Sequence, residues 1–117
     1  MTTVLLVGGD LMARARLQDA ASRAGAELHT VAKGALSEAL VSDPPDLVVL
    51  DLDEGREPVL QELEAARSRG ARPARVIGYF SHVDERLGEA ARRAGCEALP
   101  RGRFWRELPR LLGGDGA

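Results

Sequence analysis

The 117-residue sequence predicts a single α/β domain, in which helices cover both faces of one five-stranded parallel sheet. Strand and helix patterns alternate along the chain, which is typical of parallel sheets built from strand–helix units. Residues 47–50 form an uninterrupted apolar run after two prolines, as expected of a central strand that is buried on both faces. This length is enough for one domain with a hydrophobic core and too short for two.

The first half of the chain contains two predicted strand–helix units and the central strand. Val4–Val7 is a short apolar strand, and Asp10 follows it at the position of a helix N-cap. The helix after it has an apolar stripe and ends at Gly25, which suits a left-handed C-cap. A half-polar strand over 27–31 suits a sheet edge, and the second helix must stop before Pro44 because residues preceding proline disfavour helix.

The second half continues the alternation. We expect the third helix to begin at Pro58, an acceptable first-turn residue, and to end at Gly70. Residues 75–80 have the composition of a fourth strand. Asp84 can then cap a fourth helix, which Gly95 closes.

A short strand over 97–99 and a final helix complete the pattern. Pro109 lies inside that helix and should kink or split it, because proline removes one backbone hydrogen bond. Residues 1–113 are therefore predicted to form the domain, and 114–117 a disordered tail. Right-handed crossovers favour a flavodoxin-like three-layer sandwich with five strand–helix units and strand order 2-1-3-4-5.

The composition excludes several classes of protein. The chain is 44% apolar and 29% charged with a net charge of −2, so its charge gives no reason to expect nucleic-acid or membrane binding. It lacks both a membrane-length apolar run and a signal-peptide pattern, so we expect a cytoplasmic protein. A single cysteine and two histidines make an internal disulfide impossible and a structural zinc site unexpected. The excess of arginine over lysine fits a GC-rich bacterial genome.

Acidic residues and glycines gather at the predicted carboxyl edge of the sheet, where open α/β domains carry out their chemistry. Asp51 closes the apolar run of the third strand, and Asp53 follows two residues later. Gly8 and Gly9 follow the first strand, with Asp10 directly after them. In the predicted strand order the first and third strands are neighbours, which brings these five residues together.

The chain resembles response-regulator receiver domains over nearly its whole length. The resemblance rests on the segments VLLVGGD, DPPDLVVLDLD, RVIGYFSHVDE and AARRAGCEALPRGRF, which occur in the family's order and spacing. It implies a CheY-like fold and a role in two-component phosphorelay signalling, with Asp51 at the phosphoacceptor position.

Other site positions depart from the family pattern. The acidic pair that holds Mg²⁺ in receivers is replaced by Gly8 and Gly9. The hydroxyl-bearing residue after the fourth strand falls on Phe80, or on Ser81 if the register slips by one. The basic residue after the fifth strand falls on Arg101, where the family has lysine. These changes predict an atypical receiver with no metal cofactor, or with weak Mg²⁺ binding only.

From this pattern we expect a stand-alone receiver-like domain that is not an enzyme and acts by binding another protein, without Mg²⁺-dependent phosphorylation. The partner would be a signalling protein, such as a histidine kinase or a second copy of the chain. Trp105, with Arg103 and Arg106 around it, is the predicted interface, on a surface formed by the fourth helix, fifth strand and fifth helix.

Two alternatives stay open. In the first, Asp51 is a working phosphoacceptor that uses Asp10 or Asp53 as a metal ligand, with Ser81 and Arg101 completing the site. In the second, the chain is a flavodoxin-like enzyme or small-ligand protein that binds an anion at the Gly8-Gly9 turn. The sequence contains no evident nucleophile–base pair, so catalysis has little support.

Overall fold

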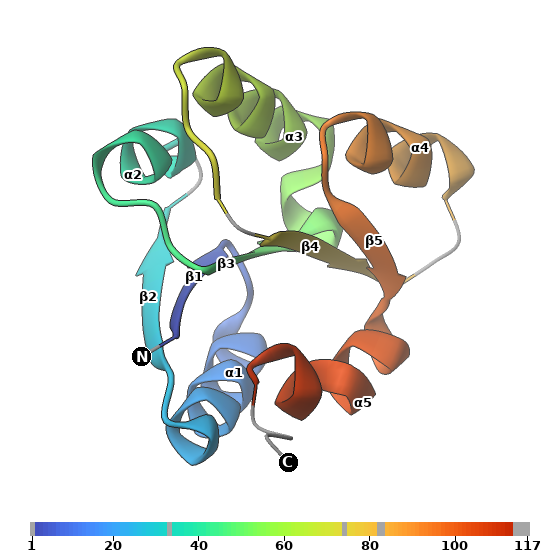
Figure 1. The fold of residues 1–117 in the computed structure, drawn as a ribbon. Coiled ribbons are helices and arrows are strands. Elements are labelled where there is room, and N and C mark those ends of the chain that lie inside the picture. The colour runs from blue at the N-terminus through green and yellow to red at the C-terminus, as the bar shows by residue number, and fades with distance from the viewer. Residues whose placement is uncertain (1, 33, 74, 82–83, 114–117) are drawn as a thin grey trace.

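The computed structural model describes residues 2–32, 34–73, 75–81 and 84–113. Five parallel strands form one sheet in the order β2-β1-β3-β4-β5, which confirms the predicted fold class and strand order (Figure 1). The strands are β1 (Thr3–Val7), β2 (Glu27–Val31), β3 (Leu47–Asp51), β4 (Arg75–Phe80) and β5 (Glu97–Pro100). The helices are α1 (Leu11–Ala24), α2 (Leu36–Ser42), α3 (Leu52–Ser68), α4 (Glu85–Arg93) and α5 (Arg101–Leu111).

The sheet separates two hydrophobic cores. Helices α1 and α5 cover one face, whereas α2, α3 and α4 cover the other (Figure 1). Successive strand residues alternate between the two cores, so that Val49 packs under α1 and α5 while Val48 and Leu50 pack under the other helices. Every residue of β3 is buried, as predicted for the central strand.

The predicted helix boundaries of α1 and α4 are confirmed. Asp10 Oδ1 accepts a hydrogen bond from the Ala13 amide at 2.8 Å, and Asp84 Oδ1 accepts one from the Leu87 amide at 3.0 Å. Gly25 has a φ of 72°, the left-handed conformation expected of the residue that ends α1.

The main body of the third helix begins around Pro58, as predicted, but a helical turn that was not predicted precedes it. Helix α3 begins at Leu52, directly after the strand, because the Asp51 side chain caps it by accepting a hydrogen bond from the Glu54 amide at 3.1 Å. The chain breaks at Arg56, whose φ of 45° and ψ of −144° are not helical, and Pro58 lies just after this break. A short helical turn therefore separates Asp51 from the main body of α3.

The last helix is also not split as predicted. Helix α5 runs from Arg101 to Leu111 through Pro109, and Leu108 and Leu112 on either side of the proline are buried against the sheet. Burial of these side chains compensates for the lost backbone hydrogen bond. The predicted disordered tail, 114–117, lies outside the described residues. Within the described part of the chain, no helix is both long and apolar enough to cross a membrane.

Candidate functional site

Asp51 lies at the carboxyl end of β3 and is only 4% exposed. Its Oδ1 atom accepts the capping hydrogen bond from the Glu54 amide, and its Oδ2 atom accepts a hydrogen bond from the Tyr79 hydroxyl at 3.2 Å. Strand register explains the second contact, since Tyr79 on β4 lies directly beside Asp51. Both oxygens of this carboxylate are thus bound inside the protein.

Tyr79 is a site residue that sequence reasoning missed. Its ring stacks on Phe104 with centroids 4.9 Å apart, lies 5.7 Å from the Trp105 ring, and has the Arg101 guanidinium 5.0 Å above it. Burial, followed by the charge of Asp51, raises the pKa of Tyr79 far above its ordinary value, so the hydroxyl stays a donor. The sequence did contain a signal for this residue: a tyrosine within the predicted fourth strand, which is otherwise largely apolar. A buried tyrosine hydroxyl needs a hydrogen-bond partner, so a polar group was to be expected beside it.

A second cluster, around Asp53, joins the first turn of α3, the residue after β4 and the first residue of α5. Asp53 accepts hydrogen bonds from the Ser81 amide at 2.9 Å, the Ser81 hydroxyl at 2.6 Å and the Arg101 Nη1 atom at 3.0 Å. Partial burial favours a higher pKa for Asp53, but the Ser81 hydrogen bonds and the Arg101 charge outweigh it and lower that pKa. The side chains of Asp53 and Arg101 are each 31% exposed, so this cluster is open to solvent whereas Asp51 is not.

This cluster also answers the open question of register after β4. Phe80 is half-buried and packs against the core under α2, α3 and α4. The hydroxyl that reaches the carboxyl edge is that of Ser81, one residue later, and it lies 3.4 Å from the Arg101 Nη1 atom. Three residues of the predicted residual site, Ser81, Arg101 and Asp53, therefore meet. Ser81 and Arg101 bind Asp53 rather than Asp51.

The Gly8-Gly9 turn has a backbone that only glycine adopts easily. Gly8 has a φ of 77° and Gly9 a φ of 85°, both in the left-handed region. A Cβ atom on Gly8 would lie 3.0 Å from the Glu54 Oε1 atom and 3.8 Å from the Asp51 Cβ atom. An acid at this position would therefore meet both backbone strain and a neighbouring carboxylate.

Asp10 lies at the rim of the site. It caps α1 with one oxygen, while its other oxygen is 4.0 Å from the Arg101 Nη2 atom. Arg101 thus places a fixed positive charge between Asp10 and Asp53. Among the described residues, no three His, Cys, Asp or Glu side chains are grouped so that they could hold a metal ion. Gly8 and Gly9 supply no carboxylate, and the carboxylates of Asp10, Asp51 and Asp53 each accept hydrogen bonds from the protein.

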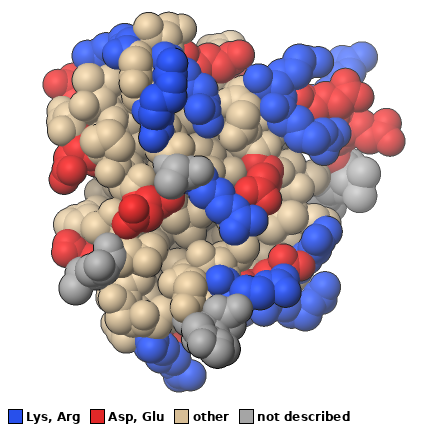
Figure 2. All heavy atoms as spheres, in the orientation of Figure 1, with Lys and Arg blue, Asp and Glu red and all other residues tan. Residues whose placement is uncertain are grey.

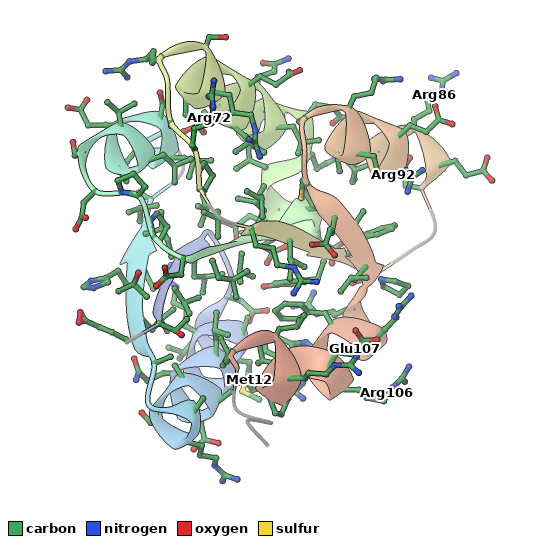
Figure 3. The ribbon with its side chains drawn as sticks, viewed as in Figure 1. Met12, Arg72, Arg86, Arg92, Arg106 and Glu107 are labelled. Atoms are coloured by element: carbon green, nitrogen blue, oxygen red, sulfur yellow. The ribbon has the colours of Figure 1, made fainter. Side chains whose placement is uncertain are left out.

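The predicted interface residues do not form one surface facing α4. Trp105 lies on the α1 side of α5, where the Arg16 guanidinium is 4.4 Å from its ring and Phe104 packs against its edge at 4.9 Å. Arg106 is exposed and projects from α5 near Glu107, which pairs with Arg103 at 2.7 Å (Figure 3). The location expected for Trp105 is therefore wrong, because the helix turns that ring toward α1.

Neither a protein-family model nor a curated protein sequence matches this chain. Its structure is similar to that of a response regulator from Hahella chejuensis, with a TM-score of 0.80, 17% identity, and coverage of 97% of this chain and 93% of the other. A response regulator from Thermotoga maritima gives 0.77 and 19%, with coverage of 97% and 95%. The receiver domain of NarL from Mycobacterium tuberculosis gives 0.77 and 22%, with coverage of 99% and 98%. The chain has the CheY-like receiver fold that its sequence predicted.

Proposed function

We propose that this chain is a receiver-like signal-transduction domain that acts by binding another protein and does not use Mg²⁺-dependent phosphorylation of Asp51. The observation that carries the proposal is the closed environment of Asp51, whose two carboxylate oxygens accept hydrogen bonds from the Glu54 amide and the Tyr79 hydroxyl. A phosphoacceptor needs a carboxylate oxygen that can reach the phosphoryl donor.

Modification of Asp51 would cost several interactions at once. The incoming phosphoryl group would displace the Tyr79 hydroxyl or the α3 cap, and each hydrogen bond to a charged group contributes about 1.5–3 kcal/mol. It would also enter a site where the acid is 4% exposed and where the nearby Arg101 guanidinium is already bound to Asp53. Without a metal ion, little remains to neutralise charge in the transition state of phosphoryl transfer.

The first test is chemical modification. The natural chain is incubated with acetyl phosphate and Mg²⁺, and in parallel with beryllofluoride, and is followed by intact mass and by ¹⁹F NMR. We expect no stoichiometric adduct and no bound fluoride signal. An adduct that Asp51→Asn removes would overturn the proposal in favour of a working phosphoacceptor. An adduct that Asp53→Asn removes instead would also overturn it, and would place the acceptor in the open cluster.

The second test concerns the metal. Amide chemical shifts around Asp51 should change little as Mg²⁺ is added, and low-millimolar saturation that Asp51→Asn abolishes would contradict the proposal. Restoring acids with Gly8→Asp and Gly9→Asp should not create tight binding. Each substitution places a side chain in the left-handed region at a cost of about 1–2 kcal/mol, and the first adds a carboxylate beside Glu54.

A binding role also explains the Asp53 cluster better than an enzymatic one. Its acid, hydroxyl and guanidinium are bound to one another at 2.6–3.4 Å, which fixes the start of α3, the residue after β4 and the start of α5 relative to each other. We infer that this cluster holds one conformation of the carboxyl edge in place of a phosphorylation-driven switch. Adding a phosphoryl mimic should therefore leave the amide shifts of α4 unchanged.

A further inference from the structure

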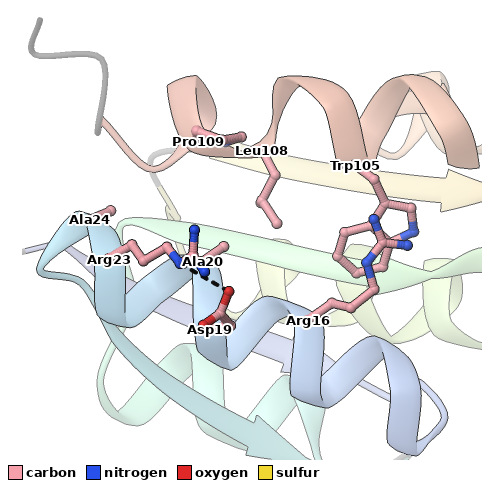
Figure 4. Close-up of a pocket in the computed structure, with 8 residues that line it drawn as sticks. All are labelled: Arg16, Asp19, Ala20, Arg23, Ala24, Trp105, Leu108 and Pro109. Carbon is pink, nitrogen blue, oxygen red and sulfur yellow. Dashed lines mark ion pairs between the residues drawn. The ribbon is translucent and has the colours of Figure 1, made fainter.

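A groove lies between α1 and α5 (Figure 4), and neither Asp51 nor Asp53 lines it. Its volume is about 340 Å³. The residues that line it are Arg16, Asp19, Ala20, Arg23 and Ala24 from α1, and Trp105, Leu108 and Pro109 from α5. The two helices leave this space open because α1 presents alanines, rather than larger side chains, toward α5.

The floor of the groove is apolar and aromatic. Trp105 is half-buried and packs on Phe104, while Leu108 is fully within the core. Ala20 and Ala24 form the opposite wall and are half-buried. A tryptophan in a partly desolvated hollow is the kind of residue that dominates the binding energy of protein interfaces.

The two helices that form the groove carry a positive net charge in a chain that is acidic as a whole. Together α1 and α5 contain seven arginines and two acids, a formal charge of +5, in a chain whose net charge is −2. The rest of the sequence therefore carries a formal charge of −7. Arginines over α5 are visible on the face shown in Figure 2. Of these charged residues, Arg16, Arg23 and Asp19 line the groove, so an apolar floor is combined with a border whose formal charge is +1.

The charges beside the groove are available to an acidic ligand. Within the described part of the chain no carboxylate pairs with Arg16, whose guanidinium lies 4.4 Å from the Trp105 ring. Asp19 is paired with Arg23 at 3.1 Å, so its negative charge is compensated at the groove edge. That pair is exposed and therefore weak, and Arg23 can also turn toward a bound carboxylate.

We propose that the α1–α5 groove docks an acidic, amphipathic helical segment of a partner protein. From Arg16 to Ala24 the wall is about 12 Å long, which accommodates about two turns of a helix. Apolar side chains one turn apart would contact Trp105 and Leu108, and flanking Asp or Glu would pair with Arg16 and Arg23. This inference rests on the proposed function, because it names the partner chemistry of a chain that acts by binding.

A protein segment fits these features better than a nucleic acid. The whole chain is acidic, with a pI of about 5.7, so its overall field repels a long polyanion, whereas a short acidic helix meets only the local arginines. An apolar floor also gives no advantage to a phosphate backbone. A second copy of this chain, nucleic acid and anionic lipid are therefore competing outcomes of the test.

The test selects peptides from a displayed library of random 14-residue sequences against the immobilised full chain. We expect the selected peptides to carry several Asp or Glu and two apolar residues spaced by three or four. Trp105 is the only tryptophan, so its fluorescence reports occupancy of the groove directly. Binding should shift that emission and should weaken as salt is added.

Three variants locate the site. Arg16→Glu should weaken the selected peptide about 10-fold, and Trp105→Ala, measured with a labelled peptide, about 30-fold, the equivalent of an interface anchor. If Trp105→Ala is unstable, Ala24→Glu fills the groove from the half-buried end of α1 and should also weaken binding about 10-fold. Arg86→Glu, the same charge change on an exposed α4 arginine, is the matched control and should bind normally.

Several results would overturn the groove proposal. One is the selection of neutral or basic peptides. Another is equal peptide binding to the natural chain and to the Arg16→Glu and Ala24→Glu variants. A third is tighter binding at Trp105 by duplex DNA, anionic vesicles or a second copy of the chain. None of them depends on Asp51. If the peptide tests fail and Asp51 stays unmodified, the groove proposal is wrong and the proposed function stands. If the peptide tests succeed and Asp51 is modified, the groove proposal stands and the proposed function is wrong.

Discussion

Replacing Tyr79 with phenylalanine tests the closed environment of Asp51 most directly. The substitution removes the hydroxyl that donates to Asp51 Oδ2 and keeps the ring that stacks on Phe104. It leaves a buried carboxylate oxygen without its donor. A hydrogen bond to a charged group contributes about 1.5–3 kcal/mol, so we expect the free energy of unfolding to fall by about 2 kcal/mol. In a domain of this size, that lowers the melting temperature by roughly 6 to 10 °C.

The assay is urea denaturation followed by the fluorescence of Trp105, whose ring lies 5.7 Å from that of Tyr79. A double-mutant cycle with Asp51→Ala isolates the pair. Once Asp51 is gone, the hydroxyl has lost its acceptor, and Tyr79→Phe should cost less than about 0.5 kcal/mol. The coupling energy should therefore be about 1.5–2 kcal/mol. Near-UV circular dichroism checks that the aromatic stack is intact in every variant.

The same hydroxyl predicts a dependence of stability on alkaline pH. Burial and then Asp51 raise the pKa of Tyr79 above its ordinary value of 10.0, so above pH 10 the unfolded chain loses a proton that the native state keeps. Stability should fall as pH rises above 10, and Tyr79→Phe should remove that tyrosine contribution. Two results would refute the reasoning: a change below 0.5 kcal/mol in the natural background, or titration of the only tyrosine near pH 10 while the protein is folded.

Three further predictions concern packing and backbone. Gly78→Ala should lower the free energy of unfolding by about 1–3 kcal/mol, since its Cβ would lie 2.6 Å from a leucine of α3, whereas Gly88→Ala on α4 should be neutral or stabilising. Arg56→Gly should raise the urea midpoint by relieving its positive φ, and Arg56→Ala should lower it. Burial and then a nearby glutamate raise the pKa of Cys96 to about 12, so at pH 8 its thiol should react about 1,000-fold more slowly than an exposed thiol, and rapid labelling would contradict this.

The features predicted well from the sequence are those set by local spacing. Periodicity identified all five strands, and acid–helix–glycine patterns located α1 and α4, because a cap and a C-terminal glycine act within a few residues. Strand order followed from the handedness of crossovers, which depends on backbone geometry alone. These are the levels at which neighbouring residues determine structure.

The features that were missed depend on the direction in which side chains point across elements. The bond from Tyr79 to Asp51 needs the register between β3 and β4, and no local pattern specifies that register. Trp105 lies at the border of the inward stripe of α5, and the neighbour that its ring contacts depends on how α5 packs beside α1. Adjacent helix residues are turned by about 100° from each other, so spacing along the chain does not say which neighbouring helix a border residue contacts.

The Asp53 cluster shows how one helix boundary decides the chemistry of the edge. Residues i and i+2 of a strand share a face, so continuing β3 as an extended chain would have placed Asp53 on the same side as Asp51. Instead the Asp51 carboxylate caps a helical turn that begins at Leu52, which turns Asp53 outward to meet Ser81 and Arg101. The hydroxyl and the cation of the predicted site thus serve an acid two residues beyond the strand end. Asp51, the acid at the strand end, instead accepts a hydrogen bond from the Tyr79 hydroxyl. Because Ser81 and Arg101 bind Asp53 and not Asp51, we expect the chain to signal without modification of Asp51.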